Sequence, residues 1–148
     1  MAKQITPLLK SEFFTLSELI SSATAKRNNI SNIPDASIIE NLQYGCDKVL
    51  DPLRRRLGKA IIITSGYRCQ QLNKLVGGVS NSWHTQGNAA DIHIESEEDA
   101  KCIFDILKKL PSVDTALFEH SKTSKWLHVQ WNKTKSPRQH FNFNYKAV

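Results

Sequence analysis

The sequence predicts a single α+β domain with a small, largely antiparallel sheet flanked by helices. Two observations support this fold class. The chain has 148 residues, enough to bury a core of its own, and no repeat, low-complexity tract or Pro/Gly/Ser-rich linker divides it. Helical patterns come before and between short strand patterns that do not follow one another directly, which favours α+β. We therefore expect one domain over residues 1–148.

Capping residues and apolar spacing mark the helices. A T-x-x-E capping box opens a short helix over residues 15–20. Apolar residues recur at helical spacing over residues 38–57, where Pro52 should kink or split the helix and Gly58 should end it. Further helices are predicted over residues 70–76 and 97–110.

Short apolar or alternating runs mark the strands. They are predicted at residues 61–63, 89–94, 115–119 and 126–131, with the tail HFNFNYK as a closing edge strand. The run at 61–63 is three consecutive isoleucines and indicates a buried strand. In the run at 89–94, strand alternation places Asp91 and His93 on one face and the apolar residues on the other.

Composition limits the partners and the compartment. The net charge of +6, from 20 Lys and Arg against 14 Asp and Glu, favours a polyanion such as a cell-wall polymer. Binding of nucleic acid would rest on this charge alone, because no interleaved basic and aromatic motif appears, so we expect no nucleic-acid partner. No apolar run is long enough to cross a membrane, and MAKQITPLLK does not have the form of a signal peptide. We expect synthesis in the cytoplasm and no membrane insertion.

Two histidines and an aspartate form a candidate metal set. His84 lies in a predicted loop, Asp91 on the strand that follows it, and His128 within a later strand. Two imidazoles and one carboxylate suit zinc and leave a fourth position open for water. Gly87 would let the loop turn sharply between the first two ligands. On spacing alone, surface or hydrogen-bonded core histidines are the favoured interpretation.

A set of motifs in a fixed order along the chain favours the metal site over that interpretation. The chain contains S-x-H-x-x-G-x-A-x-D at residues 82–91, followed by W-x-H at 126–128. It also contains S-G-Y-R, NKLVGGVSNS and FTLSEL, at residues 65–68, 73–82 and 14–19. Together they resemble the zinc D-alanyl-D-alanine carboxypeptidases and the related phage endolysin peptidases, whose zinc fold is similar to that of the hedgehog signalling domains. The resemblance covers roughly residues 13–131, the expected core of the domain.

The resemblance implies a role for each matching residue. His84, Asp91 and His128 would bind Zn²⁺, Arg68 would bind a carboxylate of the substrate, and Ser82 would hold its carbonyl or backbone. The implied reaction is hydrolysis of an amide bond in the peptidoglycan stem peptide or cross-link. The implied protein is a phage or prophage endolysin or a cell-wall peptidase, which would reach the wall through a membrane lesion made by a holin-like partner.

The general base is the point at which this chain departs from the pattern. Many relatives have an acid three residues before the last zinc histidine, and here that position is Lys125, whose charge would repel the metal. The nearest preceding acid is Glu119, which could face the zinc-bound water if the two neighbouring strands form a hairpin. The alternative interpretation is that Glu119 is a solvated residue at a strand end. Asp114 is a weaker candidate for the general base.

Two further histidines and a second function complete the predictions. We expect a structural or supporting role for His93, and we expect His120 to face solvent. Lys125 also keeps open a function of a different class, a catalytically silent zinc-binding module of the same fold.

Overall fold

Five strands form one mixed sheet in the order β1-β2-β4-β3-β5 in the computed structural model, which describes residues 8–147. The strands are β1 (Ile63–Ser65), β2 (Ala89–His93), β3 (Thr115–His120), β4 (Lys125–Gln130) and β5 (His140–Ala147). All neighbouring pairs are antiparallel except β3 and β5, which are parallel. The predicted α+β class is confirmed. Residues 1–7, which include most of the segment tested for a signal peptide, lie outside the described range.

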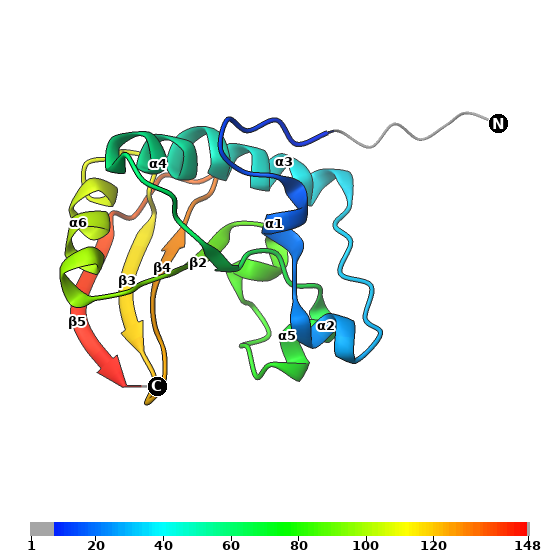
Figure 1. Cartoon of the computed structure of the whole chain (residues 1–148). Helices are drawn as coiled ribbons and strands as arrows, with labels where there is room; N and C mark the ends of the chain where they lie inside the picture. Colours follow the sequence, from blue (N-terminus) through cyan, green and yellow to red (C-terminus); the bar gives the residue numbers. More distant parts are fainter. Residues whose placement is uncertain (1–7, 148) are drawn as a thin grey trace.

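Short helices surround this sheet. They are α1 (Leu16–Ile20), α2 (Ala23–Arg27), α3 (Ala36–Gly45), α4 (Asp51–Leu57), α5 (Gln70–Leu75) and α6 (Glu97–Leu107), with a π-helical turn η1 (Cys46–Leu50) and a 3₁₀ turn η2 (Trp83–Gln86). Figure 1 shows β3 and β4 between α6 on one side and α1, α2 and α5 on the other. The capping box forms as predicted: the Thr15 hydroxyl accepts from the Glu18 amide, and the Glu18 carboxylate accepts from the Thr15 amide.

One face of the sheet packs into the hydrophobic core. Ile92 on β2, Leu127 on β4 and Phe118 on β3 are at most 1% exposed, and they are direct neighbours across the three strands. The core that they join also contains apolar residues of α3, η1, α4 and α6. Because successive side chains of a strand point to opposite faces, the residues on either side of these three lie on the face away from that core.

Of two local predictions, one is confirmed and one is wrong. The long helix is divided by η1 into α3 and α4, with Pro52 in the first turn of α4, and Gly58 ends it at φ 75°, as predicted. A proline lacks the amide that would bond the carbonyl four residues earlier, and the wider η1 turn directly precedes it. The predicted strand at 61–63 begins only at Ile63, and Ile62 is 61% exposed rather than buried.

Candidate metal centre

Strand pairing brings two of the candidate ligands together. Asp91 on β2 is the direct antiparallel partner of His128 on β4. Their chain neighbours Ala90, Ile92 and Leu127 are buried in the core, so Asp91 and His128 project from the opposite face. Residues that pair directly across antiparallel strands have side chains within reach of each other. The sheet therefore sets the separation of these two ligands.

The third ligand comes from η2. The Ser82 hydroxyl caps this turn by accepting from the His84 amide at 3.2 Å. Gly87 ends it at φ 74°, a backbone conformation that side chains disfavour, and a Cβ there would lie 2.9 Å from Ile38. The indole Nε1 of Trp131 donates to the Gly87 carbonyl at 3.1 Å, which fastens the end of the loop to the core.

The three side chains converge on one point. Oδ1 of Asp91 lies 2.8 Å from Nδ1 of His128 and 3.4 Å from Nε2 of His84. All three ligand atoms lie within 4.8 Å of one another, and within residues 8–147 no other group of three His, Cys, Asp or Glu side chains comes together in this way. His84 is buried, and the other two side chains are partly exposed.

The outer nitrogen of each imidazole has an oxygen acceptor. Nδ1 of His84 lies 2.7 Å from the carbonyl oxygen of Gly66, and Nε2 of His128 lies 2.7 Å from Oε1 of Gln130. Both oxygens can only accept, so each of these nitrogens donates a hydrogen. The nitrogens left for a metal are therefore Nε2 of His84 and Nδ1 of His128, the two that face Asp91.

This donor set fits zinc. A tetrahedral zinc ion with ligand bonds of about 2.0–2.1 Å places its ligand atoms about 3.4 Å apart. The two separations from Asp91, 3.4 Å and 2.8 Å, are close to that value. Two imidazole nitrogens and one carboxylate oxygen form a common catalytic zinc set, with a fourth position open to water.

The charges of the site favour an ionised Asp91. Burial opposes its ionisation, but the interactions with the His128 and His84 rings outweigh burial and hold the pKa of Asp91 well below its ordinary range. Burial likewise favours the neutral His128 ring, whereas Asp91, Gln130 and Glu119 together raise its pKa. The site therefore holds a carboxylate ready to bind a cation.

Arg68 and Ser82 lie beside the ligands. Nη2 of Arg68 donates to Oγ of Ser82 at 3.4 Å, and the Arg68 amide donates to the His84 carbonyl at 3.1 Å. Burial lowers the pKa of Arg68, an effect that the nearby Asp91 opposes. Among the residues that the structure describes, the buried Nε of Arg68 has no hydrogen-bond partner. Because the Arg68 side chain is partly exposed, its guanidinium can bind an anionic group beside the ligands.

Comparison with known proteins agrees with this geometry. A family model described as Peptidase M15 matches residues 12–130. The chain belongs to the peptidase M15 family. The family predicted from the motifs is thereby confirmed, and M15 members are zinc peptidases, the metal that the donor set fits. A search of curated proteins found no match. Within residues 8–147, no helix is long and apolar enough to cross a membrane.

Glu119 of this M15 peptidase lies on the metal side of the sheet. The predicted hairpin forms: β3 and β4 pair antiparallel, with Glu119 opposite Trp126 and Leu117 opposite His128. Glu119 is thus one row of side chains away from His128 on the same face, and it is close enough to contribute to the raised pKa of that histidine. A role as the base stays a prediction.

The expected repulsion between Lys125 and the metal is wrong. Lys125 pairs with His120 at the exposed start of β4, three residues before His128. An odd number of steps along a strand reverses the face, so Lys125 belongs to the same set as Leu127 and projects from the side opposite the ligands.

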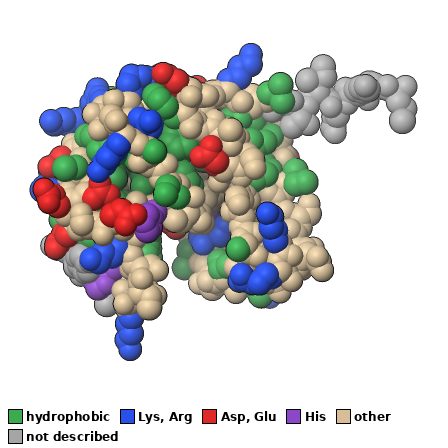
Figure 2. Space-filling view, viewed as in Figure 1, with side chains coloured by type: hydrophobic (Ala, Val, Ile, Leu, Met, Phe, Trp, Pro, Cys, Tyr) green, Lys and Arg blue, Asp and Glu red, His purple; other side chains and the backbone are tan. Residues whose placement is uncertain are grey.

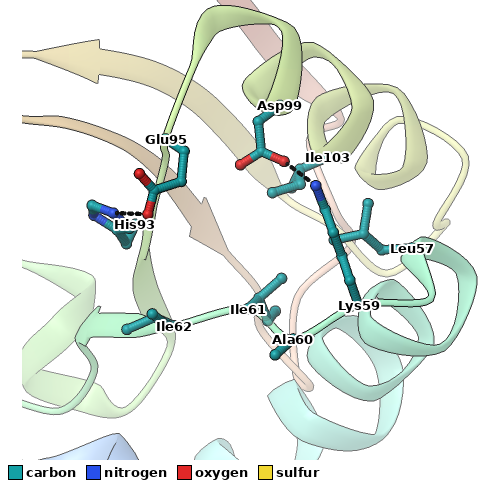
Figure 3. Close-up of a pocket in the computed structure, with 9 residues that line it drawn as sticks. All are labelled: Leu57, Lys59, Ala60, Ile61, Ile62, His93, Glu95, Asp99 and Ile103. Atoms are coloured by element: carbon teal, nitrogen blue, oxygen red, sulfur yellow. Dashed lines mark hydrogen bonds and ion pairs between the residues drawn. The ribbon is translucent and has the colours of Figure 1, made fainter.

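The remaining candidates lie outside the ligand group. His93 shares the face of Asp91, as predicted, but its Nε2 pairs with Glu95 at 2.9 Å, in a separate pocket where Lys59 pairs with Asp99 (Figure 3). His120, which was expected to face solvent, lies at the end of β3 and is half-buried. Asp114 is buried and pairs with Arg138 at 2.8 Å, so its carboxylate has a structural partner.

Sequence reasoning missed one residue of the site, Gln130. It follows His128 by two positions in β4, and this spacing alone places both on one face of the strand. A polar residue two positions after a strand ligand was therefore the available signal.

Figure 2 shows the surface hollowed between the part of the molecule that carries the β3–β4 hairpin and the part that carries α5.

Proposed function

We propose that this chain is a zinc peptidase that hydrolyses an amide bond in the peptidoglycan stem peptide or cross-link. One observation supports this substrate most directly: the guanidinium of Arg68 is partly exposed and lies beside Ser82, next to the ligand group. An arginine that binds a carboxylate in two-pronged fashion suits a short peptide with a free carboxylate near the scissile bond. Stem peptides carry such groups.

Each residue of the site has one task in this proposal. His84, Asp91 and His128 hold zinc, which supplies Lewis-acid chemistry to a carbonyl and lowers the pKa of water. Arg68 binds the substrate carboxylate, and the Ser82 hydroxyl holds the substrate carbonyl or backbone.

Glu119 moves the proton. Its carboxylate takes a proton from the attacking water and delivers it to the nitrogen of the leaving amine, as a general base and then a general acid. Its place on the metal face, one row from His128, supports this task.

The biological setting is a phage or prophage endolysin. In this part of the proposal the enzyme is made in the cytoplasm and reaches the wall with the help of a holin-like partner. The net charge of +6 would favour attachment to anionic wall polymers.

A mass-spectrometric digest of defined muropeptides tests the reaction and identifies the bond. The zinc-loaded protein should release one amine per cleaved bond, and Glu119→Gln should lose roughly 100-fold or more of the rate, the usual contribution of a general base. Glu98→Gln is the matched control, because Glu98 is exposed on α6 and should leave the rate unchanged.

The second candidate function is a catalytically silent zinc-binding module. It is favoured by Lys125, which stands where many relatives have an acid. If the wild-type protein binds one zinc ion but releases no amines from any muropeptide, this alternative replaces the enzyme.

A further inference from the structure

Gln130 is tied into the sheet in a way that aims its side chain at His128. It pairs with Ala89 on β2 and with Thr115 on β3, and its carbonyl accepts from the Asp114 amide at 2.8 Å. With its backbone fixed on both sides, its side chain lies on the metal face, and Oε1 accepts from Nε2 of His128 at 2.7 Å. The residue is half-buried, so water does not easily replace this contact.

The two histidines of the site are held in opposite orientations. His84 donates from Nδ1 to the Gly66 carbonyl, whereas His128 donates from Nε2 to Gln130. The first acceptor belongs to the backbone and is present whatever the sequence. The second depends on the side chain at position 130.

Without Gln130, Asp91 would be the partner that decides where the His128 hydrogen lies. Oδ1 of Asp91 is 2.8 Å from Nδ1, and a neutral ring with this partner alone keeps its hydrogen on Nδ1. That is the nitrogen that faces His84 and Asp91, where a metal would bind. An acceptor beside Nε2 stabilises the other tautomer of the ring, in which the hydrogen is on Nε2 and Nδ1 is free.

We propose that Gln130 is a positioning residue that holds the hydrogen of His128 on Nε2 and so presents Nδ1 to the zinc ion. The inference rests on the zinc site of the proposed function and is independent of its substrate. Partners of this kind fix ring orientation, and their removal costs about 10–100-fold in metal affinity.

The first test is long-range ¹H–¹⁵N correlation NMR of the zinc-loaded protein. We expect His128 to carry its hydrogen on Nε2 and His84 to carry it on Nδ1. The reverse assignment for His128, with Nε2 bound to zinc, would overturn the proposal.

The second test is zinc affinity, measured by competition with a chelator. Gln130→Leu should weaken binding by about 10–100-fold, whereas Gln130→Glu, which keeps the acceptor, should stay within a few-fold of wild type. Gln71→Leu, an amide lost from an exposed position on α5, is the matched control and should not change affinity.

The outcomes separate this inference from the proposed function. Equal zinc affinity in wild type and Gln130→Leu, with both proteins folded by circular dichroism, would refute it. If Gln130→Leu does not fold, the NMR assignment of the wild type decides. A wild type with the expected hydrogens but no activity on muropeptides would refute the proposed function and leave the role of Gln130 standing.

Discussion

The ligands of this site are held in two different ways. Asp91 and His128 stand on paired strands, where the ladder of β2 and β4 fixes their separation. His84 stands on a four-residue turn whose position depends on contacts from distant parts of the chain. Trp131 donates to the end of the turn, and Arg138 stacks on Trp83 within it, 5.3 Å from the ring centre. Substitution of a strand ligand should therefore affect only that ligand. The position of His84 on the turn should also depend on the residues that anchor the turn.

The largest expected effect comes from removing a strand ligand. Asp91→Asn removes the only formal negative charge of the ligand set, and zinc affinity should fall by more than the roughly 100-fold caused by loss of a supporting partner. Because the ladder remains, the zinc-free variant should keep the circular dichroism spectrum of the wild type. Isothermal titration with zinc measures the affinity, and tight binding by the variant would contradict the assignment of Asp91.

Loss of the Trp131 anchor should affect stability and the metal together. Trp131 is fully buried, so Trp131→Ala should lower the free energy of unfolding by about 3–5 kcal/mol in urea denaturation. It also frees the Gly87 carbonyl, so zinc affinity should fall in the fraction that is folded.

Leu107→Ala is the matched control for that variant. Leu107 is fully buried on α6, away from the turn, so its loss should cost about 2–5 kcal/mol without weakening zinc binding to the folded protein. If both variants bind zinc as the wild type does, Trp131 does not act as an anchor of His84.

Strain within the turn should give a smaller effect. Gly87→Ala places a side chain at φ 74°, which costs about 1–2 kcal/mol, and brings its Cβ to 2.9 Å from Ile38. Gly77→Ala has a similar φ of 79° but nothing within 4 Å of the new Cβ. Thermal unfolding should show the larger loss for Gly87→Ala, and only this variant should weaken zinc binding.

The smallest expected effect is a dependence on pH at the Arg138 anchor. Burial opposes ionisation of Asp114, but its bonds with Arg138 prevail and lower its pKa. A lowered folded pKa contributes stability above the unfolded value of about 3.9, and this is lost as pH falls through the folded pKa. Arg138→Met should therefore cost about 1 kcal/mol at pH 7, and urea denaturation should show the difference shrinking below about pH 4. A constant difference would contradict this pairing.

The sequence could predict the parts of this molecule that depend on neighbours along the chain. The capping box, the Gly58 stop and the alternation around Asp91 follow from local rules, and the family motifs placed the three ligands in order. It could not predict that β5 pairs parallel with β3, because alternation identifies a strand without naming its partner. The effect of Lys125 was misjudged because only its distance from His128 along the strand was considered. Residues three positions apart on a strand project from opposite faces. Gln130 was missed because its contact with His128 depends on the orientation of the His128 ring, which the sequence does not give.

The contact between α3 and the end of β4 has a consequence for how this chain can vary. A Cβ on Gly45 would collide with the indole ring of Trp131, so the helix rests directly against that ring. The side chains at positions 45 and 131 therefore share one space, and the size of one limits the size of the other. Alanine at 45 requires a smaller residue at 131, and a smaller residue at 131 leaves a void that alanine at 45 would partly fill. Changes at these two positions should compensate each other, so that the double variant is more stable than the sum of the single losses implies.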